Sequence, residues 1–114
     1  SDFSRLETAR EQAAKLNLII ILKGAHTAVI PPSGKVYFNS SGNPGMAKGG
    51  SGDVLTGILT GLLSRGYESF AAAMLGVYLH GSAADLATEN IHEECLLPTD
   101  LLEYLPAAFQ YVTE

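Results

Sequence analysis

A glycine-rich segment that opens directly onto an apolar helix constrains this chain more than any other feature. Residues 49–53 read Gly-Gly-Ser-Gly-Asp, and apolar residues at helical spacing follow from Val54. Glycine has no Cβ, so its backbone can turn tightly and approach a ligand closely. The first N–H groups of a helix lack intrahelical partners, and the helix dipole adds partial positive charge there. The sequence therefore predicts an anion site, most often for phosphate, at this segment.

The carboxylate of Asp53 is unexpected beside such a site. A carboxylate that pointed toward the bound anion would repel it. Asp53 could instead cap the helix, or act as a general base on a neighbouring hydroxyl group. A simple turn with Asp53 as an N-cap is the alternative interpretation. The preceding Asn-Pro-Gly at residues 43–45 and the uninterrupted helix that follows favour the ligand site.

Length and charge limit the class of protein. The 114 residues fit one domain, and 46% of them are hydrophobic, as in an ordinary packed protein. The net charge of −5 argues against broad binding to nucleic acid or to anionic membranes. The single cysteine, Cys95, cannot form an internal disulfide, and no Cys/His spacing suggests a zinc site. No secretory signal and no apolar run of membrane-spanning length is recognisable, so we expect a cytoplasmic protein.

The first half of the chain predicts a helix, a strand and a hairpin. Apolar residues recur at helical spacing over residues 3–16, and Asn17 is expected to end this helix. The apolar, β-branched run at 18–22 is typical of a strand buried on both faces, as in a parallel sheet under helices. Two short extended runs, at 27–30 and 35–38, surround a Pro/Gly turn and predict a hairpin.

The helix after the glycine-rich segment is predicted from one apolar stripe between residues 54 and 63. Gly66 is the expected left-handed residue at its end. Gly57 and Gly61 lie about one helical turn apart, so they would let a neighbouring backbone approach closely.

Two further helices are predicted in the last third of the chain. Ser69 is expected to cap a buried helix over residues 70–88, which is apolar on nearly every side. After a linker at 96–98, a short last helix is expected to start at Thr99 or Asp100. Pro106 is expected to interrupt it, because proline lacks the backbone N–H that an interior helical residue donates.

One buried strand cannot form a central parallel sheet by itself. Its partner strands would have to come from residues outside this chain or from another copy of it. The chain also starts without methionine, inside a pattern that already predicts a helix. We therefore expect an incomplete domain whose exposed strand edges favour self-association, as a homo-oligomer.

Residues 23–27, Lys-Gly-Ala-His-Thr, follow the C-terminal end of the predicted buried strand. Ligands bind at this end of the strands in open α/β sheets. Lys23 offers a cation, Gly24 offers close backbone approach, and His26 and Thr27 offer polar contacts. A polar turn between two strands is the alternative interpretation.

Four other side chains have simpler expected roles. His80 lies in the middle of the predicted buried helix, where a hydrogen-bonded core histidine is the common case. Asp85 follows on the same helix and is expected to face water. Lys48 is a candidate phosphate contact or an exposed loop lysine. Cys95 has acidic neighbours that disfavour a thiolate, so no role is expected for it.

Three motifs together resemble those of a known family. They are Lys-Gly-Ala-His-Thr at 23–27, the stretch at 43–57 that begins Asn-Pro-Gly-Met-Ala, and Val-Tyr-Leu-His-Gly at 77–81. In order and spacing the chain resembles the ribokinase-like ADP/ATP-dependent NAD(P)H-hydrate dehydratases, whose domain is carbohydrate-kinase-like. The resemblance implies the C-terminal part of a three-layer α/β/α sandwich, with a β-hairpin and a mostly helical C-terminal half. Residues 1–114 would be a partial domain that lacks its N-terminal part.

The resemblance also implies a reaction, a lyase activity that repairs damaged NAD(P)H. ADP or ATP, with Mg²⁺, would phosphorylate the hydroxyl group of the hydrate, and loss of phosphate would restore NADH or NADPH. Asp53 would be the general base and, with Asn43, would contact the substrate. No residue is assigned to the metal. The adenine nucleotide would contact Lys23, Gly24, Ala25, His26, Thr27, Gly49, Gly50, Ser51 and Gly52.

Two alternatives remain open for the function. A small-molecule kinase of the same superfamily would use the same loop and base, but it would release a stable phosphorylated product. A non-catalytic fragment that binds nucleotide or self-assembles is the other alternative. The 114-residue piece by itself is expected to be inactive, because the resemblance places much of the substrate pocket outside it.

Overall fold

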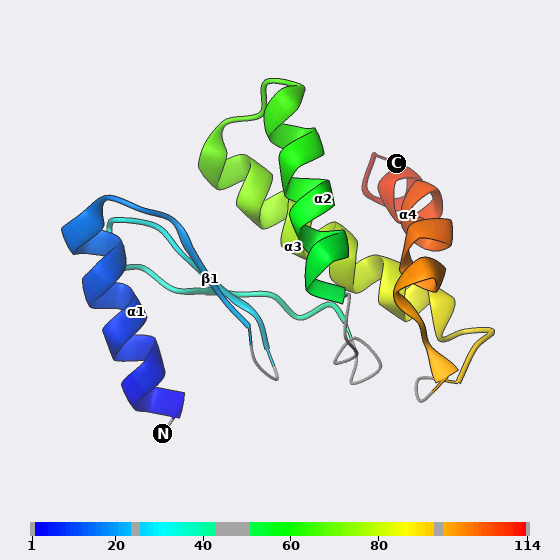
Figure 1. Ribbon diagram of the computed structural model, residues 1–114, viewed down its shortest axis with the longest axis horizontal. Helices are drawn as coiled ribbons and strands as arrows, with labels where there is room; N and C mark the ends of the chain where they lie inside the picture. Colours follow the sequence, from blue (N-terminus) through cyan, green and yellow to red (C-terminus); the bar gives the residue numbers. More distant parts are fainter. Residues whose placement is uncertain (1, 24–25, 43–50, 93–94, 114) are drawn as a thin grey trace.

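The computed structural model describes residues 2–23, 26–42, 51–92 and 95–113 (Figure 1). Their order follows the predicted pattern of a helix, three strands and three helices. The elements are α1 (Asp2–Leu16), β1 (Ile20–Leu22), β2 (Ala28–Ile30), β3 (Tyr37–Phe38), α2 (Ser51–Ser64), α3 (Ser69–Ala87) and α4 (Pro98–Thr113).

The three strands form one antiparallel sheet in the order β1-β2-β3. Ile20 of β1 lies opposite Ile30 of β2, and Ala28 of β2 lies opposite Phe38 of β3. The predicted hairpin of β2 and β3 is therefore confirmed. The prediction for β1 was wrong in one respect, since its residues are only half-buried. Within the described residues, β2 is the only strand that pairs with β1, so the opposite edge of β1 carries no ladder.

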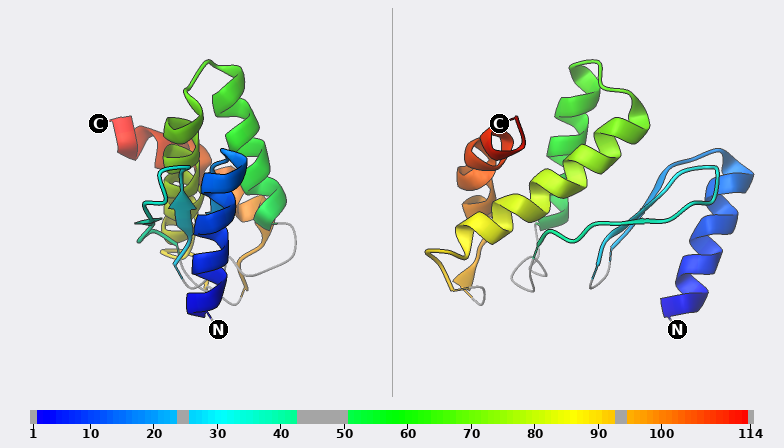
Figure 2. Two further views of the ribbon diagram at one scale, coloured as in Figure 1. Left: turned by 90° about the vertical axis from the view of Figure 1, so that its left-hand side faces the viewer. Right: turned by 180° about the vertical axis from the view of Figure 1, so that it is seen from behind.

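Helices cover both faces of this sheet (Figure 2). Successive strand residues point to opposite faces, and this alternation divides the side chains of β2. Ala28 and Ile30 pack against Ala13 of α1. Val29, between them, packs on the other face against Leu55 of α2 and other residues of α2 and α3. The described part of the chain is thus a three-layer α/β/α arrangement, as predicted.

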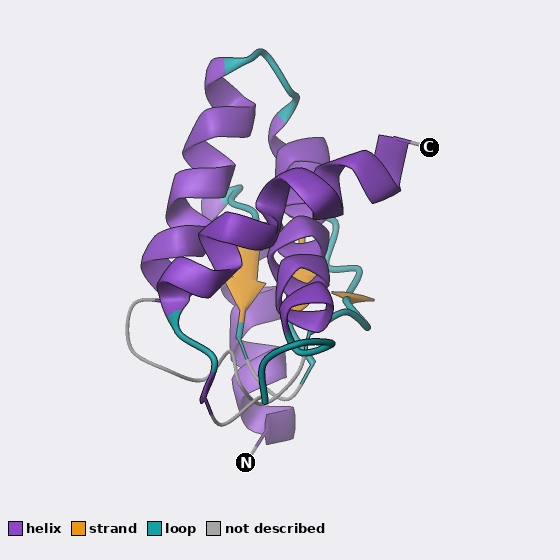
Figure 3. Cartoon of the chain, turned by 90° about the vertical axis from the view of Figure 1, so that its right-hand side faces the viewer, coloured by secondary structure: helices purple, strands orange, loops and turns teal. Residues whose placement is uncertain are grey.

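Helix α3 is buried along most of its length and packs against α2 and α4. Figure 3 shows the helical side of the molecule, with the strands behind the helices. Eleven of its residues are buried, which confirms the prediction from its apolar sequence. The cap was predicted one residue too late. Glu68 is the N-cap, and its carboxylate accepts hydrogen bonds from the backbone N–H groups of Phe70 (3.0 Å) and Ala71 (3.1 Å). Ser69 is the first residue of the helix.

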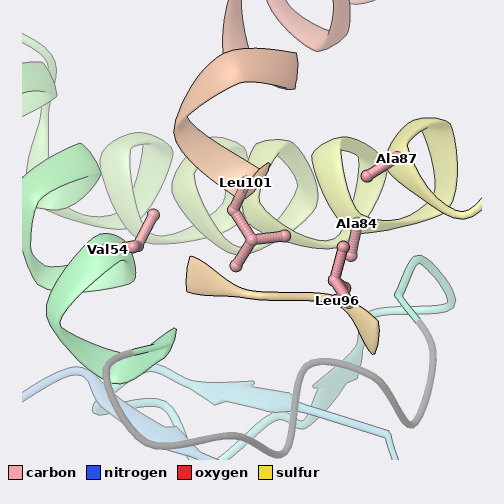
Figure 4. Packing of buried hydrophobic residues seen from close by; sticks show 5 residues of the cluster. All are labelled: Val54, Ala84, Ala87, Leu96 and Leu101. Atoms are coloured by element: carbon pink, nitrogen blue, oxygen red, sulfur yellow. The ribbon is translucent and has the colours of Figure 1, made fainter. Parts of the chain in front are cut away.

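Helix α4 packs against α3 and runs without a break through Pro106, so the predicted interruption was wrong. Tertiary packing on both sides of the proline explains the difference. Leu101 and Ala108 are buried before and after it. Figure 4 shows Leu101 beside residues of α2, α3 and the linker before α4. That core cluster consists of Val54, Ala84, Ala87, Leu96 and Leu101.

Predictions about the ends of α1 and α2 were confirmed, whereas predictions about close packing at glycines were wrong. Gly66 (φ +92°) adopts a left-handed conformation after α2, as predicted. Asn17 ends α1, as predicted, and it too is left-handed (φ +56°). The predicted close approach at Gly57 and Gly61 is absent, because no described neighbour lies within 4 Å of a Cβ built there. At Gly76 of α3 a Cβ would instead lie 2.6 Å from the side-chain atom Leu59 Cδ2, and at Gly81 it would lie 2.7 Å from the backbone carbonyl carbon of Ser41.

Candidate functional site

The end of β1 and the first turn of α2 meet on one side of the molecule (Figure 1). Lys23 directly follows β1, and Gly52 is the second residue of α2. A Cβ built on Gly52 would lie 3.4 Å from the Lys23 Nζ. Two motifs that lie far apart in the sequence are therefore side by side. Because Gly52 has no Cβ, no side chain of its own stands between its backbone and the ammonium group of Lys23.

The electrostatics of this junction favour an anion. Helix α2 is 14 residues long, and the N–H groups of its first turn carry the positive end of the helix dipole. Lys23 is exposed and adds an ammonium group that can donate to an oxyanion. The hydroxyl of Thr56 donates to the Gly52 carbonyl (3.0 Å) within the same helix. A helix N-terminus and a cation together can bind a phosphate group.

The sheet holds the other described residues of the first motif. His26 is exposed and Thr27 is half-buried just before β2. The Thr27 carbonyl accepts a hydrogen bond from the Asn39 N–H (2.8 Å), which continues the pairing of β2 and β3 by one step. The backbone of Thr27 is thereby fixed at the sheet, whereas the His26 side chain is open to solvent.

Several predicted site residues cannot be placed. Ser51 and Asp53 lie in the first turn of α2 by their backbone, and their side chains are not among those described. The structure therefore leaves their roles as predictions. The residues that lie outside the described ranges are Gly24, Ala25, Asn43, Lys48, Gly49 and Gly50.

Two residues near the site were missed by the sequence patterns. Arg5 of α1 donates from Nη2 to the carbonyl of Lys23 (3.3 Å). Asp85 is exposed, as expected, and its Oδ2 also accepts a hydrogen bond from the Gly42 N–H (2.9 Å), which was not predicted. Both contacts join residues that are far apart in the sequence, so no local sequence pattern predicts them.

The remaining candidates lie away from this junction. His80 is buried in α3, in agreement with the prediction of a core residue. Cys95 is a free, exposed thiol. Among the residues that the structure places, no group of three or more His, Cys, Asp or Glu side chains could hold a metal ion. None of the described helices is long and apolar enough to cross a membrane.

An apolar groove of about 320 Å³ lies between β3 and α3. It contains none of the predicted site residues. Tyr37 at its edge contacts Phe70 with a ring-to-ring distance of 5.2 Å. The lining includes Tyr37, Phe38, Met74, Leu75, Val77 and Tyr78.

Comparison with known proteins reveals one consistent likeness. The family model described as NAD(P)H-hydrate dehydratase matches residues 1–107. The chain is 46% identical, over 96% of its length, to a bifunctional NAD(P)H-hydrate repair enzyme of Moorella thermoacetica. It is 40% identical, over 93% of its length, to the ADP-dependent (S)-NAD(P)H-hydrate dehydratase of Bacillus subtilis. The chain spans only 21% and 38% of the lengths of these two relatives.

Solved structures give the same result for the fold. The ADP/ATP-dependent NAD(P)H-hydrate dehydratase of B. subtilis, co-crystallised with ATP and Mg²⁺, matches 96% of this chain with a TM-score of 0.89 at 38% identity. The chain covers 40% of that structure. A ribokinase-like superfamily protein of Enterococcus faecalis matches 91% of this chain with a TM-score of 0.78 at 35% identity, and 35% of that protein is covered.

Proposed function

The chain belongs to the NAD(P)H-hydrate dehydratase family, and on that premise we propose that it carries the phosphate-binding part of an enzyme that repairs NAD(P)H hydrate. Its fold is that of the ribokinase-like α/β proteins. One observation of geometry supports the proposal most directly. Lys23 lies against Gly52 at the N-terminus of α2, where an anionic phosphate group would be bound.

The reaction would take place in two steps. In the first, the hydroxyl group of the hydrated nicotinamide ring loses its proton to a base, and its oxygen attacks the terminal phosphorus of ADP or ATP. The shortened nucleotide leaves. In the second step, the carbon–oxygen bond breaks, inorganic phosphate leaves, and loss of a ring proton restores the double bond of NADH or NADPH. Phosphorylation thus converts a poor leaving group into a good one.

The described residues would contribute binding and charge stabilisation. Lys23 and the N–H groups of the first turn of α2 would hold the phosphate oxygens while negative charge develops on them. The backbone at Gly52 would come close to the phosphate, because no Cβ stands between them. Asp53, the next residue of α2, would accept the proton of the hydroxyl group.

A Mg²⁺ ion would neutralise phosphate charge in such a reaction. Magnesium is usually held by one or two carboxylates together with the substrate phosphates. Among the residues whose side chains are described, no group of three or more His, Cys, Asp or Glu side chains could hold a metal ion. No described residue is therefore assigned to this ion.

The active protein would be larger than the described unit. The chain covers less than half of each relative compared above, and β1 has an edge that no described strand occupies. Residues 1–114 would then form the C-terminal part of a ribokinase-like domain, which lacks its N-terminal part here. We also propose that the protein forms a homo-oligomer, because exposed strand edges and exposed Leu18 and Phe38 favour association. We further propose that it acts in the cytoplasm.

The test is a repair assay on the full-length protein. NADH hydrate is incubated with ADP or with ATP and Mg²⁺, and the return of reduced nicotinamide absorbance is followed. We expect absorbance to return, and Lys23→Ala to slow it. Lys35→Ala is the matched control, because Lys35 is an exposed lysine of the β2–β3 turn, away from Gly52.

Three results would contradict the proposal. A stable phosphorylated product without recovery of NADH would indicate a small-molecule kinase. Nucleotide binding without any turnover would indicate a binding or assembly module. Equal rates for Lys23→Ala and Lys35→Ala would remove Lys23 from the site.

A further inference from the structure

The segment 39–42, which leads from β3 toward the glycine-rich motif, is fixed on helix α3. The Asn39 side-chain amide donates to the hydroxyl (2.8 Å) and to the carbonyl (3.2 Å) of Ser41. The Ser41 hydroxyl in turn donates to the carbonyl of Tyr78 in α3 (3.2 Å). These bonds connect the segment to a helix that is buried along most of its length.

Gly81 is the point of closest approach between the segment and α3. A Cβ built on Gly81 would lie 2.7 Å from the carbonyl carbon and 2.8 Å from the carbonyl oxygen of Ser41. Such distances are too short for carbon atoms that are not bonded, and the obstacle is backbone. Any larger residue at position 81 would therefore push the segment away from the helix.

Asp85, one helical turn after Gly81, holds the next residue of the segment. Its Oδ2 accepts the Gly42 N–H at 2.9 Å. Gly42 has a φ of +105°, in the region that favours glycine, so the chain changes direction there. A hydrogen bond to a carboxylate is shorter and stronger than one to a neutral acceptor. The carboxylate thus fixes the orientation of the last described peptide before residue 43.

We propose that Asp85 is a positioning residue for the reaction. It orients the Gly42 peptide, and through it the direction in which the chain enters the motif that begins at Asn43. Asp85 touches neither nucleotide nor substrate in this proposal. Its effect is on the placement of the groups that do. The inference rests on the proposed function, because its consequence for turnover requires that activity.

The experiment compares four variants in the full-length protein. Asp85→Ala removes the acceptor, whereas Asp85→Asn keeps an oxygen that can accept the same bond. Gly81→Ala keeps Asp85 but displaces Ser41. Glu89→Ala is the matched control, an exposed carboxylate just beyond α3. Melting temperatures establish that each variant is folded.

Two readouts are needed. The first is hydrogen–deuterium exchange of a peptide that covers residues 39–42. It measures how firmly this segment is held on α3, and it does not depend on enzyme activity. The second is the hydrate-repair rate, separated into kcat and the KM for nucleotide. We expect Asp85→Ala and Gly81→Ala to exchange faster and to lose about tenfold in kcat with a smaller change in KM. Asp85→Asn should restore most of both, and Glu89→Ala should match the wild type.

The two proposals fail in different ways. Faster exchange with an unchanged kcat would overturn the positioning role, and so would unchanged exchange in Asp85→Ala. An Asp85→Asn variant as impaired as Asp85→Ala would also overturn it. If the wild type regenerates no NADH, the proposed function is wrong. In that case the exchange measurement still tests whether Asp85 holds segment 39–42 on α3.

Discussion

The ammonium group of Lys23 lies against Gly52, with its Nζ 3.4 Å from the position that a Cβ on Gly52 would occupy. One residue follows a strand and the other belongs to the first turn of a helix. The space that a Gly52 side chain would fill therefore lies within the candidate site. It can be tested by filling that space.

We expect Gly52→Val to weaken binding of the adenine nucleotide by about tenfold or more, because the new methyl groups would crowd Lys23 and the first helical turn. Calorimetric titration of the full-length protein with ADP and ATP measures the effect. Gly61→Val is the matched control, since a Cβ at that position of the same helix meets no described neighbour within 4 Å. Equal nucleotide affinity of the two variants would mean that the glycine-rich segment at residues 49–53 is only a turn.

Asp53→Asn should lower turnover by a factor of about 10² to 10⁴, the usual contribution of a general base, while nucleotide binding is largely preserved. The amide has nearly the same shape but cannot accept the proton. Repair rates and titrations on the same preparation separate the two effects. Retained activity would exclude Asp53 as the base.

Glu68 gives a prediction about pH. Hydrogen bonds from Phe70 and then Ala71 hold the pKa of its carboxyl below the ordinary value of 4.5. Because the folded pKa is lowered, the charged cap stabilises the protein above about pH 4.5, and this contribution is lost as the pH falls through the folded pKa. We expect Glu68→Gln to lower the melting temperature at neutral pH.

The same comparison at acidic pH checks the sign. Below the folded pKa both proteins carry a neutral side chain at position 68, so their melting temperatures should converge. Glu89→Gln, another exposed carboxylate near α3, serves as the control and should show no such pattern. A difference that is constant at all pH values would exclude the charged cap.

Gly76→Ala should leave the protein less stable than Gly61→Ala by about 1–3 kcal/mol, the range for an added carbon in a packed core, because both variants gain the helix preference of alanine. The added Cβ would lie 2.6 Å from Leu59 Cδ2, so the leucine would have to change its rotamer. Gly61→Ala should instead stabilise α2 by about 0.5–1 kcal/mol, since its position is open and alanine favours helix. Urea denaturation of both variants measures the difference. Destabilisation by both would indicate that Gly61 has a neighbour in solution.

The sequence predicted those features that depend on a few neighbouring residues. Gly66 and Asn17 end their helices as expected, because a left-handed conformation is a local requirement. The β2–β3 hairpin was recognisable from its turn. The buried character of α3 followed from its apolar residues, whereas the order of the three layers was implied by the family resemblance.

The wrong or missing predictions concern features that depend on contacts between residues far apart in the sequence. The continuity of α4 through Pro106 depends on packing against α3, which outweighs the loss of one backbone hydrogen bond. The close approach at Gly76, in place of Gly57 and Gly61, depends on how α2 and α3 cross. The hydrogen bond between Gly42 and Asp85 of α3, which was not predicted, joins residues that lie 43 positions apart in the sequence. No local spacing contains such information.

The candidate site shows the same division. Each of its two motifs was recognisable alone, but their meeting depends on β1 ending and α2 beginning on the same side of the molecule. The family resemblance implied this meeting, and the Lys23–Gly52 distance shows it for one pair. The part played by Asp53 is still a prediction.

The crossing of Ser41 over Gly81 also limits how this protein can change over time. Opposite sides of α3 are occupied by Ser41 and by α4, so few single substitutions on this helix would leave both neighbours in place. A mutation at position 81 would become acceptable only after the facing segment had moved. We therefore expect α3 to diverge more slowly among descendants than the exposed turn between β2 and β3.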